Sequence, residues 1–139
     1  MRTSSLMTTL ITEIAKFHGA DLDEAGARLE LAHADYPADR LIIKRAGPNQ
    51  VSVALRPGQY PILDPEAVLL TGGDAWAPVA FTSPTLGLDV MAVTLKSDGS
   101  VKRYNPAQQA GVARHVEAFA AQIQAQNWLE KGQKLNTTG

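Results

Sequence analysis

Short apolar runs rich in β-branched residues alternate with turn-forming residues between positions 67 and 104. Such runs, separated by Gly-Gly, Ser-Pro and Asp-Gly pairs, are typical of consecutive antiparallel strands. The run 88–95 is apolar on both of its faces except at Asp89, which predicts a central strand covered on both sides. Pro78 lacks an N–H donor, so it places the first half of its strand at an edge or a bulge.

Two segments show the periodicity of amphipathic helices. Residues 4–18 carry apolar side chains at three- and four-residue steps, with Ser4 or Ser5 as the N-cap and Gly19 just past the end. The closing helix starts at Asn105-Pro106, with Gln108 as the reciprocal partner of the cap. Its apolar stripe comprises Val112, Val116, Phe119, Ala120 and Ile123. Trp128 falls on the opposite side, so it contacts a neighbouring segment or partner, or the helix ends just before it.

The segment between the first helix and residue 66 is less uniform. Residues 20–40 fit either a short strand at 28–32 or a second helix, because Gly26 interrupts a helical start and 29–31 alternates. Residues 41–45 and 50–56 read as a hairpin around Gly47-Pro48-Asn49. Three prolines make 57–66 an irregular loop, in which we expect Asp64 and Glu66 to order the turn into the next strand.

These elements predict a single α+β domain spanning residues 1–139, with a core over about 4–130 and a polar tail at 131–139. We expect a four- to five-stranded, mainly antiparallel meander sheet with an N-terminal and a C-terminal helix packed on it. Two helices do not cover both faces of a large sheet, so part of one face is expected to be open to a protein partner or to self-association as a homodimer. Trp76, Phe81 and Trp128 are candidates for that contact, with the core as their alternative role.

Composition excludes several classes of function. A net charge of −1 and a pI near 6.3 argue against a surface devoted to nucleic acid. The chain has no cysteine, which excludes disulfides, thiolate catalysis and cysteine-ligated metals. No apolar run approaches the roughly 20 residues that cross a bilayer, and the N-terminus lacks a secretory signal, so we expect no membrane association and a cytoplasmic location. Met7 is a second possible start.

The residues that carry chemistry are scattered. His18, His33 and His115 lie far apart in the chain, one on each predicted helix and one in the segment between them, so their spacing predicts no metal site. Asp89 interrupts an apolar strand, although a position at the rim of the sheet, in water, accounts for it as well. There is no nucleophile motif and no phosphate-binding loop. We therefore assign no catalytic, cofactor-binding or metal-binding residue.

Charge is unevenly distributed along the chain. Residues 1–39 hold three basic and seven acidic side chains, whereas residues 40–63 hold four basic side chains and no acid. If the hairpin forms, these basic residues cluster at one edge beside Tyr36 and Tyr60, where they could meet phosphates or an acidic partner. The alternative is that they protect an edge strand from aggregation. The partner- or phosphate-binding candidates are Arg40, Lys44, Arg45, Arg56 and Tyr60.

Several short motifs follow one another in a distinctive order. They are the strand 50–54, Asp64-Pro65-Glu66, Trp76-Ala77-Pro78-Val79, Leu86-Gly87, Asp98-Gly99 and the helix 119–128. This order resembles a family of uncharacterised bacterial domains of unknown function, often encoded on plasmids and mobile elements. The likeness covers about residues 40–128 and departs from the family after Ala54, where a more polar loop is replaced. The resemblance implies a small α+β fold and no reaction.

Three functional hypotheses follow, in order of preference. The first is a non-catalytic binding or accessory module that uses the sheet face or the 40–60 edge. The second is a weak nucleic-acid binder that acts through the basic residues. The third is a small enzyme built around Asp89 or a histidine, which would require a deep pocket with convergent polar groups.

Overall fold

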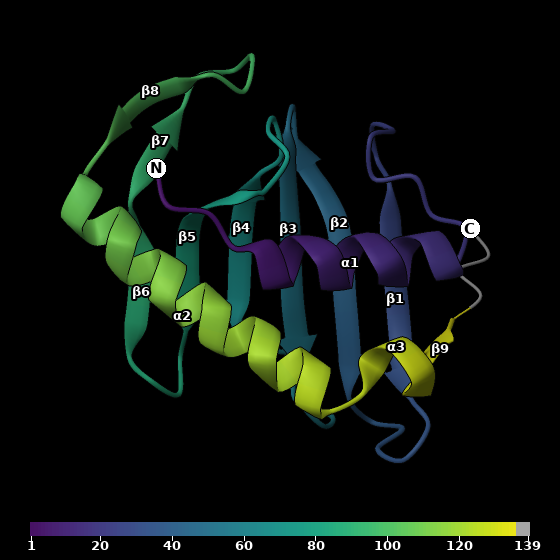
Figure 1. Cartoon of the computed structure of the whole chain (residues 1–139). Coiled ribbons are helices and arrows are strands. Elements are labelled where there is room, and N and C mark those ends of the chain that lie inside the picture. The colour runs from purple at the N-terminus through teal and green to yellow at the C-terminus, as the bar shows by residue number, and fades with distance from the viewer. Residues whose placement is uncertain (136–139) are drawn as a thin grey trace.

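A computed structural model describes residues 1–135 as a seven-stranded antiparallel sheet with its helices on one face (Figure 1). The strand order is β6-β5-β4-β3-β2-β1-β9, and β7 and β8 form a separate two-stranded ribbon. The helices are α1 Ser5–Phe17, α2 Pro106–Ala125 and α3 Trp128–Lys131. The strands are β1 Arg28–His33, β2 Arg40–Gly47, β3 Gln50–Arg56, β4 Glu66–Leu70, β5 Ala77–Ser83, β6 Leu88–Met91, β7 Val93–Leu95, β8 Val101–Tyr104 and β9 Gly132–Lys134. The α+β class and the antiparallel meander are confirmed, but the sheet has more strands than predicted.

Both predicted helices begin at the predicted caps. The Ser4 side chain accepts a hydrogen bond from the Met7 N–H at 3.2 Å, and the Asn105 side chain accepts one from the Gln108 N–H at 3.0 Å. The reciprocal role predicted for the Gln108 side chain is wrong, because the Asn105 N–H donates to the Ala92 carbonyl instead. Each cap therefore links its helix to the strand or loop beside it.

The main core lies between the helices and one face of the sheet. The strand register aligns inward-facing residues across neighbouring strands, for example Ile43 with Val53 and Val53 with Ala67. Ile14 of α1 and Ile123 of α2 are fully buried against this layer. Removing so much apolar surface from water contributes about 25 cal/mol per Å², which makes this layer the main source of stability.

Trp128 and Phe81 belong to this core and are not partner contacts. Trp128 is 1% exposed and Phe81 is 3% exposed. Helix α2 ends at Ala125, and Asn127 takes a left-handed conformation that turns Trp128 inward. The helix ends before Trp128, and the Trp128 ring also contacts a neighbouring segment, with its centre 4.8 Å from that of His33 on β1, so both explanations offered for this residue are confirmed. Trp76 packs on the edge of the core, beside the start of α1.

The prediction of a central strand at 88–95 is wrong. The segment breaks after Met91: β6 is the edge strand of the sheet, and β7 leaves the sheet to pair with β8. Met91 is 69% exposed, while Ala92 and Val93 are buried. The run looked apolar on both faces because it joins two strands whose buried sides differ. The middle strand of the sheet is β3.

Other ambiguous segments are resolved. Residues 28–33 form a strand and not a second helix. The register between β4 and β5 shifts beside Pro78, so the predicted irregularity is a bulge. The polar tail starts with strand β9, which pairs with β1, and its residues 136–139 lie outside the described part of the chain. No helix within residues 1–135 is long and apolar enough to cross a membrane.

Candidate functional site

The second face of the sheet carries no helix (Figure 1). Side chains alternate along each strand, so the register defines which residues share this face. We call it the helix-free face. One row across it runs Arg28, Lys44, Ser52, Val68, Ala80 and Met91, and the next runs Glu30, Ile42, Ala54, Glu66, Thr82 and Asp89. On this face β3 and β5 contribute small residues, whereas charged residues come from β1 and β2 and, singly, from β4 (Glu66) and β6 (Asp89).

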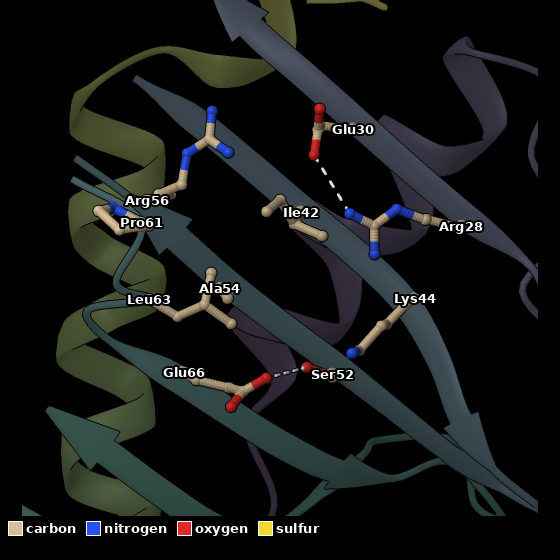
Figure 2. Close-up of a pocket in the computed structure, with 10 residues that line it drawn as sticks. All are labelled: Arg28, Glu30, Ile42, Lys44, Ser52, Ala54, Arg56, Pro61, Leu63 and Glu66. Carbon is tan, nitrogen blue, oxygen red and sulfur yellow. Dashed lines mark hydrogen bonds and ion pairs between the residues drawn. The ribbon is translucent and has the colours of Figure 1, made fainter. Parts of the chain in front are cut away.

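A hollow of about 240 Å³ opens on this face above β2 and β3 (Figure 2). Its floor consists of Ile42, Ser52 and Ala54, which are 6%, 2% and 1% exposed. Pro61 and Leu63, from the loop that joins β3 to β4, form one wall. The floor is buried without a helix above it, so this loop and the long charged side chains provide its cover.

The wall is held in place by hydrogen bonds at both ends of the loop. The Asp64 N–H donates to the Leu55 carbonyl at 2.7 Å, and the Leu55 N–H donates to the Pro65 carbonyl at 3.0 Å. Near the other end, the Gly58 N–H donates to the Asp39 carboxylate at 2.7 Å. The hollow is therefore supported by fixed backbone on that side.

The rim of the hollow has five charged residues, and three of them have polar partners. Arg28 and Glu30 form an ion pair at 3.2 Å, and the Ser52 hydroxyl donates to Glu66 at 2.9 Å. Within residues 1–135, Lys44 makes no ion pair or side-chain hydrogen bond. The Nε of Arg56 is buried and has no acceptor in the same part of the chain. A buried donor without an acceptor costs about 1–3 kcal/mol, so an acceptor that reached the Arg56 Nε would stabilise the protein.

The structure brings together only part of the predicted basic cluster. Lys44 and Arg56 line the hollow, whereas Arg45 points to the other side of the sheet and donates to the carbonyls of Gly47 and Asp23. Neighbouring residues of a strand face opposite ways, which separates Lys44 from Arg45. The prediction that these residues line an edge is wrong, because β2 and β3 are interior strands. For the same reason, the alternative that these residues protect an edge strand from aggregation is also wrong.

Two further predicted residues lie near the hollow but do not line it. Arg40 is paired in register with Arg56, and its guanidinium donates to the carbonyls of Pro37 and Asp39. Tyr60 is 73% exposed on the loop between β3 and β4. Tyr36 is also exposed, and its ring lies 5.3 Å from that of His33. These residues flank the hollow.

The sequence interpretation missed Arg28, Glu30 and Glu66. All three face the hollow because β1 and β4 pair with β2 and β3 in the observed register. The alternating pattern of residues 28–32 was the available signal that Arg28 and Glu30 share one face of a strand, but the sequence of this segment fitted a helix as well. Glu66 required the long-range pairing of β3 with β4, which local sequence does not specify.

The three histidines occupy separate structural positions. His33 is buried: its Nδ1 accepts from the Asp35 N–H, so its Nε2 donates to the Gln126 carbonyl at 2.7 Å. Burial, followed by the nearby charge of Lys134, lowers the pKa of His18. His115 stacks on Phe81 with ring centres 5.2 Å apart. Across residues 1–135, no group of three or more potential ligands is placed to hold a metal.

The carboxylates considered for catalysis are also in structural or solvent positions. Asp89 is exposed on the edge strand, as its alternative interpretation expected. Asp64 accepts hydrogen bonds from Thr85 and from the Ser83 hydroxyl, the latter at 2.7 Å. Partial burial acts to raise the pKa of Asp64, but the hydrogen bonds from Thr85 and Ser83 outweigh it and lower the pKa. Asp64 therefore stays ionised. Its carboxylate orders the turn between β5 and β6, whereas the turn into β4, which it was predicted to order, is held by backbone hydrogen bonds of residues 64 and 65.

A second hollow, of about 390 Å³, lies between α2 and β5. Its lining includes His115, Phe119 and Asp64. The carboxylate of Asp64 already accepts hydrogen bonds from the turn between β5 and β6, and no hydrogen bond joins it to His115 in the described structure. The lining thus lacks the coupled acid and base that hydrolytic or proton-transfer chemistry requires.

Comparison of the chain with protein-family models, curated proteins and solved structures found no match. The helix-free face has to be interpreted from its own geometry.

Proposed function

We propose that the protein is a non-catalytic binding module that uses its helix-free face to bind an acidic segment of a protein partner. The observation that carries the proposal is the hollow on that face, where Lys44 and Arg56 have no acidic partner among residues 1–135 above a largely apolar floor. The bacterial mobile-element family and the cytoplasmic location expected from the sequence remain part of this proposal.

An acidic segment fits this face because the surface offers both charge and apolar contact. The rim supplies two cations that no carboxylate of residues 1–135 neutralises. The floor and wall supply Ile42, Pro61 and Leu63, which can contact the methylene groups of an acidic side chain. Complementary charge increases the association rate and disfavours basic partners.

Nucleic acid is a weaker candidate for the same surface. Glu30, Glu66 and Asp89 share the face with the cations, so a backbone with a charge on every nucleotide would meet repulsion along its length, whereas an acidic segment can place a single carboxylate beside Lys44 and Arg56. If only Lys44 and Arg56 neutralised phosphates, the log–log salt dependence of duplex binding would have a slope of about −2. That is too little electrostatic attraction for a duplex-binding surface.

Fluorescence anisotropy with a labelled peptide of alternating glutamate and alanine tests the proposal. The wild-type protein should bind this peptide and should bind its glutamine counterpart more weakly. Lys44→Gln combined with Arg56→Gln should abolish the difference between the two peptides. Lys102→Gln combined with Arg103→Gln is the matched control, because these exposed residues on β8 lie outside the helix-free face. Equal binding by both double variants would contradict the proposal.

Two parallel measurements identify other occupants of the face. Tighter binding of duplex DNA than of the acidic peptide, lost in the Lys44 and Arg56 variant, would replace the proposal with nucleic-acid binding. A dimer in light scattering that the same variant dissociates would assign the face to a second copy of the chain.

A further inference from the structure

Arg56 is the residue of the hollow whose hydrogen bonding is incomplete. Its Nε is buried without an acceptor among the described residues, and a guanidinium does not lose its charge at accessible pH. The strand places it opposite Arg40, whose own guanidinium is held by loop carbonyls. An acceptor for this guanidinium can enter from the hollow that Arg56 lines.

The acids of the rim are directed to other donors. Glu30 pairs with Arg28 at 3.2 Å, and Glu66 accepts from Ser52 at 2.9 Å. Figure 2 shows Arg28, Lys44 and Arg56 arranged around the Ile42 and Ala54 side chains. An anion in the hollow would be surrounded by donors, with apolar groups beneath it.

The size of the hollow limits what can enter. At about 30 Å³ for each water in the liquid, 240 Å³ corresponds to roughly eight waters. That volume suits a carboxylate on a short methylene stem and is small for a nucleotide. Pro61 and Leu63 line the side along which such a stem would lie.

The charges favour a planar group that carries a single negative charge. A phosphate concentrates up to two negative charges on one tetrahedral group at neutral pH, and Glu30 and Glu66 in the rim would repel the second, whereas a dicarboxylate carries one charge on each of two separate groups. A carboxylate carries one charge and matches the planar fork of a guanidinium. We propose that the hollow anchors a single carboxylate, which accepts hydrogen bonds from Arg56 and Lys44. This proposal rests on the proposed function and specifies the group of the partner that the site recognises.

NMR titration with glutarate as the probe tests this assignment. The Nε–H resonance of Arg56, identified by its loss in Arg56→Lys, should shift on addition of glutarate and should respond less to glutaramide or inorganic phosphate. Arg56→Lys keeps the charge and removes Nε, and it should weaken glutarate binding about tenfold, as expected for one charge-assisted hydrogen bond. Arg103→Lys is the control and should bind as the wild type does. A melting curve confirms that each variant is folded.

The outcomes separate this inference from the proposed function. Phosphate binding as tight as glutarate, or glutarate binding unchanged in Arg56→Lys, would overturn the carboxylate anchor. An acidic peptide that binds the face without moving the Arg56 resonance would also overturn the anchor while leaving the binding module intact. Glutarate binding that depends on Arg56, with no binding of acidic peptides, would support the anchor and assign it to a free dicarboxylate.

Discussion

Replacing Arg56 by methionine should stabilise the protein. The Arg56 Nε is a buried donor without a partner among the residues that the structure describes, and such a donor costs about 1–3 kcal/mol. Methionine keeps an unbranched apolar stem of similar reach and removes the donor. Part of this gain is offset, because the rest of the guanidinium contacts water and the methionine thioether that replaces it interacts with water less well. We expect the free energy of unfolding to rise by about 1 kcal/mol, toward the lower end of that range.

Urea unfolding followed by circular dichroism at 25 °C measures this change. For a chain of this size, a gain of 1 kcal/mol corresponds to a rise in Tm of about 4 °C. Arg103→Met on the exposed strand β8 is the matched control and should stay within about 0.5 kcal/mol of the wild type. The same Arg56→Met variant should lose binding of acidic ligands, which is the trade-off expected where a binding site is kept at the expense of stability.

A loss of stability in Arg56→Met would refute this reasoning. It would mean that the Arg56 guanidinium contributes to the fold and is not held ready for a ligand. The carboxylate anchor would then have no energetic basis.

Two other substitutions test how the fold is held together. Ser4→Ala should lower the free energy of unfolding by about 1–2 kcal/mol, because the fully buried Ser4 both caps α1 and donates a hydrogen bond to Glu117 at 2.6 Å. Urea unfolding measures this change, and a loss of stability no greater than that caused by Ser5→Ala at the exposed neighbouring position would contradict the prediction. For Asp64, the folded pKa is lower than the unfolded one, so its contribution should be complete above about pH 4 and decrease as the pH falls through the folded pKa. The stability difference between the wild type and Asp64→Asn should therefore narrow in acid, and a difference that widens below pH 4 would contradict the assignment.

The sequence was sufficient where local signals agree with one another. Both long helices carry a capping residue followed by an apolar stripe. In the hairpin, the strand 50–56 alternates in sequence and follows a turn that contains Asn49 in a left-handed conformation. Asp98-Gly99 forms the predicted turn, with Gly99 at a φ of 87°. Such features depend on neighbouring residues alone, so tertiary structure did not alter them.

The segment 88–95 shows where local patterns were insufficient. Its apolar residues belong to two different strands, β6 and β7, and nothing in the composition marks the break between Met91 and Ala92. The break is produced by long-range contacts: the Ala92 N–H donates to the Val79 carbonyl, and its own carbonyl accepts from Asn105. The assignment of this run as central also misplaced the centre of the sheet, which is β3.

The binding site was partly accessible from the sequence. Lys44 and Arg56 were identified from the charge imbalance, and the position of Arg45 on the other face followed from strand alternation that the interpretation did not apply. Arg28 and Glu66 enter the site only through the pairing of strands far apart in the chain. Register between distant strands is set by the packing of the whole core, which is why those residues were missed.

The central claim is that the helix-free face binds an acidic segment, and adjacent isoleucines of β2 test it most directly. Ile42 lies on the floor of the hollow, whereas Ile43 is fully buried beneath the helices. Methyl NMR spectra recorded during titration with the glutamate–alanine peptide should show a shift of the Ile42 resonance and little change at Ile43. A titration in which peptide binds but Ile42 does not shift, or in which Ile43 shifts more, would contradict the account.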